Sequence, residues 1–401
     1  MRDSEPLRVA VTNWSSRRVG GIEEYLSLLI PALHGAGPAV AFWHEVDAPG
    51  DRRAIELPPG VEDICAAKLG VDRAIDALRD WRPDVIYAHS VSDPDLESRL
   101  QTLAPSVLFL HEYRGTCISG AKTFTRPVAT PCDRTFGWPC LAQYFPRGCG
   151  GRSPITMWRQ FQLQSSRLEV VRKYQSILTH TTHMKGEMAK HGVAVDVVPY
   201  PVAACIESPK TVPERGALRL LFAGRMDFVK GGRYLLDALP AVASATGRPI
   251  TVTFAGDGPQ RRSLEARARK VDAPNVSIQF AGWVTQERIG TLMADADVLV
   301  VPSLWPEPFG SVGPVAARHG VPAAAFDVGG IGEWLIQGVT GHLAPSDPPT
   351  PEGLARAIVR CLDDPDHHAT LRAGAREMAT RFTMAQHLPA LMDALERAAA
   401  R

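Results

Sequence analysis

The residues best suited to hold a polar ligand lie at positions 302–311, in the sequence Pro-Ser-Leu-Trp-Pro-Glu-Pro-Phe-Gly-Ser. Glu307 stands between two prolines, whose restricted backbone pre-organises the carboxylate. A carboxylate accepts hydrogen bonds from hydroxyl groups such as those of a sugar. The N–H groups of Phe309, Gly310 and Ser311 precede an expected helix start and would point at an anion. This segment therefore predicts a site for a diphosphate joined to a sugar.

A second loop carries two cations. Arg225 ends an expected strand in Ala-Gly-Arg, and Lys230 follows five residues later, before two glycines. Arginine can bind two phosphate oxygens at once, whereas lysine acts as a point charge. The loop is suited to bind a diphosphate. The alternative is that Arg225 and Lys230 are two solvated surface cations that bind no ligand.

Gly20 and Gly21 follow the first expected strand and open a helix, so bare N–H groups would meet an anion there. The alternative is that the two glycines only form a tight turn and contact no ligand. Neither GxGxxG nor the spacing of a P-loop occurs here, which disfavours an NAD enzyme or an NTPase.

Four of the seven cysteines fall within 33 residues, at Cys117, Cys132, Cys140 and Cys149. The odd total excludes a full disulfide framework, and the spacing contains no CxxC pair. A structural zinc, disulfides and unligated thiols all stay open, with zinc the most favoured of the three.

These residues are positioned by two arrays in which apolar runs alternate with helical patterns, as in an α/β fold with parallel sheets. The expected strands are 8–12, 39–43, 85–88, 106–110, 176–179 and 196–198 in the first array, and 218–223, 250–255, 276–281, 296–301 and 322–326 in the second. Beyond residue 340 the pattern predicts helices alone. We expect two doubly wound, Rossmann-like domains that face a central cleft.

The domain boundaries follow from these patterns. They are an N-terminal domain over 1–200 with a four-cysteine insertion at 115–152, a proline-rich linker over 201–217, a C-terminal domain over 218–380, and a terminal helix over 381–401.

Composition excludes several classes of protein. No run of 18 apolar residues occurs, so no transmembrane segment is expected. The 44 basic and 43 acidic residues leave a net charge of +1, which predicts no nucleic-acid partner. The N-terminus shows no export signal, and we expect a cytoplasmic protein. The oligomeric state cannot be predicted from the sequence.

The ordered motifs resemble those of a GT-B glycosyltransferase of the family-4 type, which is retaining and uses nucleotide sugars. The resemblance covers most of the chain and rests on GGIE, AGR with KGG, GDGP, FAGWV, ADVLVVPS, EPFG, HGVPAAAFDVGG and TGHL. It implies that the domain over 1–200 binds the acceptor, that the domain over 218–380 binds the nucleotide sugar, and that the terminal helix over 381–401 returns toward the N-terminal domain. It also implies that Arg225 and Lys230 bind the β-phosphate, that Glu307 binds the donor sugar, and that Gly282, Trp283 and Val284 meet the nucleobase.

The resemblance also implies that His111, at the end of an expected strand, lies near the anomeric centre. By position alone a histidine there is more often a polar strand end. The catalytic set is then His111, Glu307, Arg225 and Lys230. We expect His111, Glu112, Tyr113 and Lys122 to contact the acceptor, because they lie at the start of the insertion or just before it.

Val315 departs from the family, which usually has a second glutamate there to contact the ribose. An apolar side chain cannot accept from hydroxyl groups, so donor binding is weakened or rebuilt. No protein nucleophile or catalytic metal is expected, because retaining transfer in this fold is argued to rely on positioning and charge. A nucleotide-sugar epimerase and a non-catalytic binding protein are the alternatives.

Overall fold

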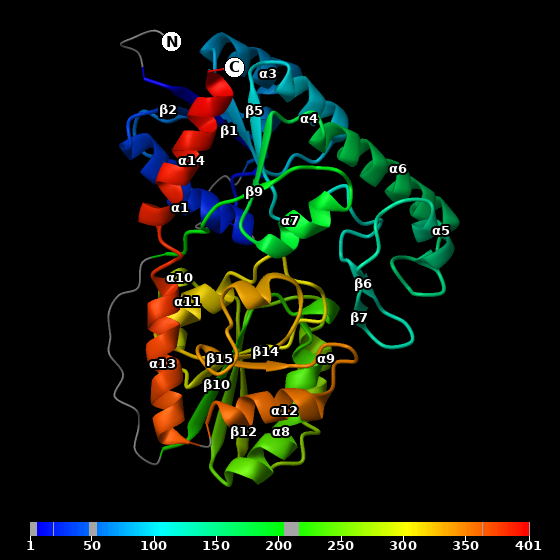
Figure 1. Cartoon of the computed structure of the whole chain (residues 1–401), viewed down its shortest axis with the longest axis vertical. Coiled ribbons are helices and arrows are strands. Elements are labelled where there is room, and N and C mark those ends of the chain that lie inside the picture. The colour runs from blue at the N-terminus through cyan, green and yellow to red at the C-terminus, as the bar shows by residue number, and fades with distance from the viewer. Residues whose placement is uncertain (1–5, 19, 48–53, 204–215, 363, 401) are drawn as a thin grey trace.

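The protein forms two domains, each built on one parallel sheet, and they lie one above the other in Figure 1. The structure is a computed structural model that describes residues 6–18, 20–47, 54–203, 216–362 and 364–400. Most of the predicted linker, residues 204–215, lies outside the described residues. None of the described helices is long and apolar enough to cross a membrane.

The N-terminal sheet has seven parallel strands in the order β3-β2-β1-β4-β5-β8-β9. Their bounds are β1 Arg8–Ser15, β2 Ala39–Val46, β3 Glu62–Cys65, β4 Val85–Ala88, β5 Ser106–Phe109, β8 Ser176–Thr179 and β9 Asp196–Val197. A short antiparallel pair, β6 (Thr123–Phe124) and β7 (Thr130–Pro131), lies in the four-cysteine insertion. Strands β4 and β5 are buried along their length, as expected when helices cover both faces of a parallel sheet.

The C-terminal sheet has six parallel strands in the order β12-β11-β10-β13-β14-β15. Their bounds are β10 Leu218–Ala223, β11 Ile250–Ala255, β12 Val276–Gly282, β13 Val298–Val301, β14 Ala323–Phe326 and β15 Gly341–Ala344. In both sheets the order reverses beside the first strand, and ligands of such folds bind at the carboxyl ends of the strands near that point. The predicted α/β class with two doubly wound domains is confirmed.

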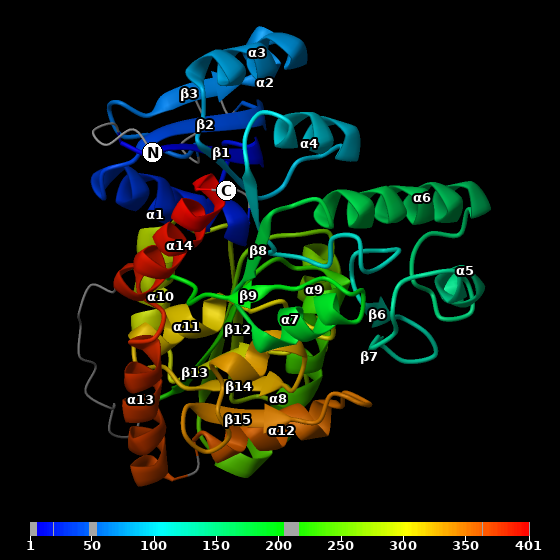
Figure 2. The same ribbon diagram turned by 45° about the horizontal axis from the view of Figure 1, so that its top comes forward.

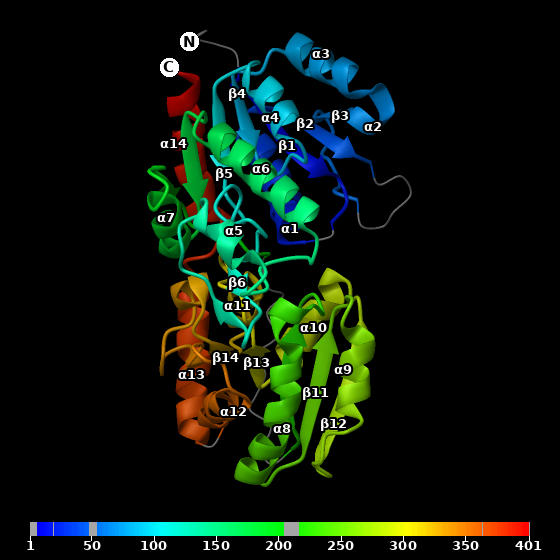
Figure 3. The same cartoon turned by 90° about the vertical axis from the view of Figure 1, so that its right-hand side faces the viewer.

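Helices flank both sheets (Figure 3). The N-terminal domain carries α1 Gly21–Gly35, α2 Ala66–Leu69, α3 Val71–Trp81, α4 Pro94–Gln101, α5 Pro139–Tyr144, α6 Pro154–Val171 and α7 Thr182–Ala189. The C-terminal domain carries α8 Gly232–Thr246, α9 Arg261–Ala268, α10 Gln286–Asp295, α11 Val312–Arg318, α12 Pro351–Arg360, α13 Pro365–Ala379 and the 3₁₀ turns η1 Phe228–Lys230 and η2 Gly329–Glu333.

The last helix, α14 (Met384–Ala399), returns to the N-terminal domain, as predicted, and packs against α1, β4 and β5 (Figure 1). It begins after Thr383, whose hydroxyl caps the N–H of Gln386. His387 fixes the contact: its Nδ1 lies 2.6 Å from the Pro199 carbonyl and its Nε2 2.8 Å from the Tyr25 hydroxyl. A carbonyl can only accept, so Nδ1 carries the proton and Nε2 accepts from Tyr25.

Two edge strands differ from the prediction. The expectation of helices alone beyond residue 340 is wrong, because β15 pairs with β14 there. A side chain at Gly341 would lie 1.9 Å from the Ala323 carbonyl oxygen, so this strand needs a glycine that strand propensity disfavours. Strand β3 was not predicted either, since Glu62 and Asp63 are exposed and give no apolar run.

Candidate active site

Glu307 lies in the loop between β13 and α11, where the sequence predicts the ligand carboxylate. It is only 3% exposed. Lys230 Nζ donates to Glu307 Oε1 at 2.6 Å, and Ser303 Oγ donates to the same oxygen at 2.5 Å. Among the described residues both hydrogen bonds end on Oε1, so Oε2 is the oxygen that can accept from a ligand hydroxyl.

Two glycines beneath this loop hold it in place. Gly329 has a φ of +58°, and a Cβ atom there would lie 2.4 Å from the Glu307 carbonyl oxygen. Gly330 N–H donates to the Glu307 carbonyl at 2.6 Å. Trp334 Nε1 donates to the Phe309 carbonyl at 2.6 Å. The backbone around Glu307 is therefore braced before any ligand arrives, as the flanking prolines suggest.

The cation loop packs against the Glu307 loop. Gly231, with φ of +65°, could not carry a side chain because its Cβ would lie 1.8 Å from the Pro302 carbonyl. The side chain of Lys230 is 27% exposed and lies 5.2 Å above the Trp305 ring. The Arg225 side chain is 73% exposed, with Nε 3.7 Å from the Asp227 carboxylate. One predicted phosphate cation thus points inward to Glu307, and the other projects into solvent.

The Gly20-Gly21 loop meets the same region from the N-terminal domain. A Cβ placed on Gly21 would lie 3.9 Å from the Ser311 hydroxyl. Tyr200 donates its hydroxyl to the Gly21 carbonyl at 3.0 Å. The structure therefore brings together two loops that are almost 300 residues apart in the sequence.

His111 follows β5 and is half-buried among other rings. Its Nε2 lies 3.0 Å from Nδ1 of His89, which follows the adjacent strand β4. The rings of Tyr25, Phe109 and His180 lie 4.7 to 5.9 Å from its centre. Burial, and then the neighbouring His89, His180 and His387, hold the pKa of His111 well below its usual value. The imidazole is therefore neutral near pH 7, with Nδ1 left to meet a ligand.

Direct contacts link the His111 and Glu307 regions across the two domains. The Tyr113 hydroxyl donates to the Pro306 carbonyl at 2.6 Å, and Thr181 Oγ1 donates to the Pro308 carbonyl at 2.8 Å. The ring of Phe309 packs on His180 and Tyr200, at 5.2 and 5.1 Å. Both segments flanking Glu307 are therefore held by the N-terminal domain.

The predicted acceptor residues divide into two groups. Glu112 is exposed and His111 is partly exposed. Tyr113 is 1% exposed and its hydroxyl is occupied by Pro306 and by His183 Nε2, which lies 2.6 Å away. Lys122 is also 1% exposed and forms an ion pair with Glu187 at 2.6 Å. Burial thus corrects the prediction for Tyr113 and Lys122, which hold the insertion and the domain interface together rather than face an acceptor.

The predicted nucleobase segment lies after β12. Gly282 adopts a φ of +69° and accepts a hydrogen bond from the Gly256 N–H at 2.7 Å. Trp283 is 53% exposed, whereas Val284 and Val315 are half-buried apolar side chains at the edge of the core. Val315 is on α11, one turn beyond Ser311.

The four predicted zinc ligands are free thiols. Burial raises the pKa of Cys149 to about 12, and the Cys117, Cys132 and Cys140 thiols add to the rise, so the four are neighbours. In the described part of the chain, however, no three Cys, His, Asp or Glu side chains are arranged to hold a metal ion. The arrangement does not fit a formed zinc centre.

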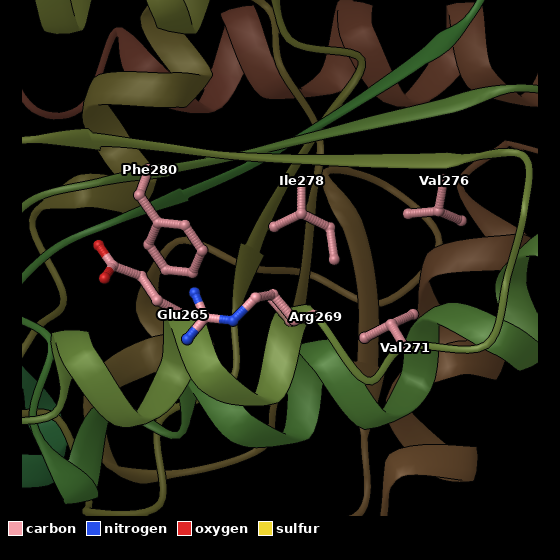
Figure 4. Close-up of a pocket in the computed structure, with 7 residues that line it drawn as sticks. Glu265, Arg269, Val271, Val276, Ile278 and Phe280 are labelled. Atoms are coloured by element: carbon pink, nitrogen blue, oxygen red, sulfur yellow. The ribbon is translucent and has the colours of Figure 1, made fainter.

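A shallow pocket lies elsewhere, between α9 and β12 (Figure 4). Glu265, Arg269 and the apolar side chains of Val276, Ile278 and Phe280 line it. None of these is a predicted site residue, and the pocket holds one carboxylate and one guanidinium with no neighbouring catalytic group. The candidate site is the set of loops at the domain interface.

Three residues that support the site were not predicted from the sequence. Ser303 lies four positions before Glu307, and a proline-rich loop gives no signal that its hydroxyl turns toward the carboxylate. His89 was detectable, because it ends the strand before that of His111 and the carboxyl ends of adjacent parallel strands lie together. Thr181 follows β8 in the same way.

Comparison with known proteins decides the family. The family model described as glycosyl transferases group 1 matches residues 217–364. The glycogen synthase of Mycobacterium tuberculosis is 31% identical over 358 residues, which cover 85% of this chain and 73% of that protein. The chain belongs to the group 1 glycosyl transferases. It is therefore a glycosyltransferase, as the resemblance of its motifs implied.

Solved structures agree with the GT-B fold of this glycosyltransferase. Sucrose-phosphate synthase from Thermosynechococcus elongatus superposes with a TM-score of 0.70 at 20% identity, covering 98% of this chain and 100% of that one. Anabaena HepE, in complex with UDP and glucose, superposes with a TM-score of 0.69 at 19% identity over the same shares. At these identities the likeness concerns the fold.

Proposed function

We propose that this glycosyltransferase takes a sugar from a nucleoside diphosphate and transfers it, with retention of anomeric configuration, to a hydroxyl group of a small molecule or glycan intermediate. The observation that carries the proposal is the Lys230–Glu307 pair. It joins a cation suited to bind phosphate to a carboxylate with one oxygen open, in a loop held by both domains. UDP and glucose in HepE support testing uridine donors first.

In this mechanism Glu307 Oε2 accepts from donor-sugar hydroxyls, while Lys230 and the exposed Arg225 neutralise the diphosphate. The bond between the anomeric carbon and the phosphate oxygen breaks, and a bond from that carbon to the acceptor oxygen forms on the same face. The acceptor proton passes to the leaving phosphate oxygen. Catalysis then depends on positioning the donor and acceptor and on stabilising the negative charge of the leaving diphosphate. No protein nucleophile is required.

Neutral His111 suits a place beside the anomeric centre. An uncharged imidazole does not repel the positive charge that develops on the sugar, and its Nδ1 is available for one hydrogen bond. His89, 3.0 Å from Nε2, orients the ring. His89 is therefore a positioning residue, which acts through His111.

The test is incubation with a panel of nucleoside diphosphate sugars, with and without candidate acceptors. The proposal expects nucleoside diphosphate release that depends on acceptor, and a product with the donor's anomeric configuration. Conversion of the donor to its epimer without acceptor would support the epimerase instead. Binding without any turnover would support a non-catalytic protein.

A further inference from the structure

The near balance of charge in the whole chain hides a local excess. Between Asp133 and Glu169 the sequence contains five arginines and no acidic residue. This segment holds α5 and most of α6, which extend away from the body of the N-terminal domain in Figures 1 and 2. The whole chain contains 43 acidic residues, so this stretch without a carboxylate differs in charge from the rest of the protein.

The same segment exposes large apolar side chains. Trp138 is 68% exposed, Ile155 66%, Trp158 43% and Leu163 37%. Positions 155, 158 and 163 lie on the outer side of α6, because the helix turns Phe161 and Leu168 toward the domain instead. The Trp138 ring lies 6.2 Å from the Trp158 ring, so the patch is continuous from the start of α5 to α6.

Two of the five arginines accompany this patch. Arg152 and Arg159 are exposed, the first just before α6 and the second beside Trp158 on its outer side. By contrast, Arg147 stacks on Phe124 at 4.3 Å, and Arg167 donates to the Ser92 carbonyl at 3.1 Å. We name the surface formed by Trp138, Arg152, Ile155, Trp158, Arg159 and Leu163 the tryptophan–arginine face.

We propose that the tryptophan–arginine face docks this enzyme on the surface of an anionic lipid bilayer. Tryptophan prefers the headgroup level of a membrane, where its ring is in an apolar layer and its N–H stays hydrated. Arginine binds lipid phosphates, and the segment itself adds no carboxylate that an anionic surface would repel. Ile155 and Leu163 suit the acyl boundary, whereas a nucleic acid offers them no partner.

Docking of this kind is reversible. Two aromatic anchors and two cations give a modest partition coefficient, because each signal alone holds a protein only weakly at an interface. The inference goes beyond the proposed function and does not depend on it. It rests on exposure and charge in the insertion and α6, not on Glu307, Lys230 or His111.

The experiment is co-sedimentation of the full chain with vesicles of phosphatidylcholine, with or without phosphatidylglycerol. Wild type should bind the anionic vesicles and release at high salt. Arg152→Glu with Arg159→Glu should lower the partition coefficient at least about tenfold, since each cation near the surface is worth about a factor of five. Arg73→Glu with Arg262→Glu reverses two exposed arginines elsewhere and should bind as wild type.

The apolar anchors are tested in the same assay. Trp138→Ser with Trp158→Ser should lower binding several-fold, while Ile336→Ser with Val339→Ser, at side chains 40% and 46% exposed in the C-terminal domain, should not. Because both tryptophans pack on Phe161 and serine removes that packing, quenching of tryptophan fluorescence by brominated lipid is a second readout, in which the tryptophans are replaced by phenylalanine. Quenching that falls in Trp138→Phe with Trp158→Phe supports the proposal.

Three outcomes would overturn it. One is the absence of wild-type binding to any of these vesicles. Another is binding that the face variants and the control variants alter equally. The third is a dimer in solution that Arg152→Glu with Arg159→Glu dissociates while vesicle binding is unchanged, which would make the face a contact between copies of the chain.

Discussion

Replacing the Glu307 carboxylate with an amide separates its structural contacts from its proposed contact with the donor. In Glu307→Gln the amide oxygen can still accept from Lys230 and Ser303, but the Ser303 hydrogen bond becomes neutral and the Lys230 ammonium loses its anionic partner. Hydrogen bonds to charged groups are worth about 1.5–3 kcal/mol and neutral ones about 1 kcal/mol. With two such bonds at 2.6 and 2.5 Å, we expect a loss of about 1–3 kcal/mol in the free energy of unfolding.

The effect on catalysis should exceed what that loss explains. If the carboxylate binds donor hydroxyls more strongly in the transition state than in the ground state, kcat should fall at least about tenfold, or ~1.4 kcal/mol. Binding of free nucleoside diphosphate should be unchanged or tighter, because Lys230 is released from its ion pair and can turn fully to the phosphates.

The assay combines urea unfolding, steady-state kinetics and calorimetry with free nucleoside diphosphate. Asp297→Asn is the matched control, because Asp297 is 6% exposed in the same domain and accepts from the Arg219 backbone N–H at 2.8 Å. It should lose stability while keeping its kcat within about twofold. Wild-type kcat and KM in Glu307→Gln would refute the role assigned to Glu307.

Four further predictions follow from the other groups. Arg225→Ala should weaken binding of nucleoside diphosphate but not of nucleoside, with no loss of thermal stability because the Arg225 side chain is 73% exposed. Lys230→Ala should weaken nucleoside diphosphate binding in the same way but should also lower the melting temperature, because buried Glu307 loses its ion-pair partner. Calorimetry measures the binding and thermal melts measure the stability. Because Val315 cannot pair a ribose hydroxyl, ribo and 2′-deoxyribo donors should have kcat/KM within a few-fold of each other, and Val315→Glu should favour the ribo donor; a strong wild-type preference for ribose would contradict this. Because no three Cys, His, Asp or Glu side chains in the described part of the chain are arranged to hold a metal ion, metal analysis of protein purified without chelator should find no stoichiometric zinc, and thiol titration should count the four clustered cysteines as free thiols; about one zinc per chain would contradict this reading. Burial lowers the pKa of His180 to about 3; the unfolded chain binds this proton near pH 6.5, so stability should fall as the pH falls below 6.5, by about 2 kcal/mol at pH 5, and less steeply in His180→Phe.

The sequence predicted the two sheets well because buried parallel strands are continuous apolar runs, as in β4, β5 and β13. Strands at sheet edges were missed because they need not be apolar, as Glu62 and Gly341 show. Of the candidate site, the loops that carry Glu307, Lys230 and Arg225 could be located because a glycine or proline loop after a strand marks the ligand edge of the sheet.

Residues that act across the interface were harder to predict. Tyr113 and Lys122 adjoin His111 in sequence, yet they turn inward because Pro306 and Glu187 offer them buried partners. The partners come from other elements, 193 residues away for Pro306. Local sequence carries no signal of such a pairing, so proximity along the chain wrongly suggested proximity to the acceptor.

The central claim is that a nucleoside diphosphate sugar binds between the Arg225–Lys230 loop and Glu307, with its anomeric carbon toward His111. The most direct test is an experimental structure with a non-transferable analogue of the donor found in the activity panel. The account predicts the diphosphate against Arg225 and Lys230, a sugar hydroxyl within hydrogen-bond distance of Glu307 Oε2, and His111 on the acceptor side of the sugar. A nucleotide bound elsewhere, for example in the pocket between α9 and β12, with these side chains unaltered, would contradict it.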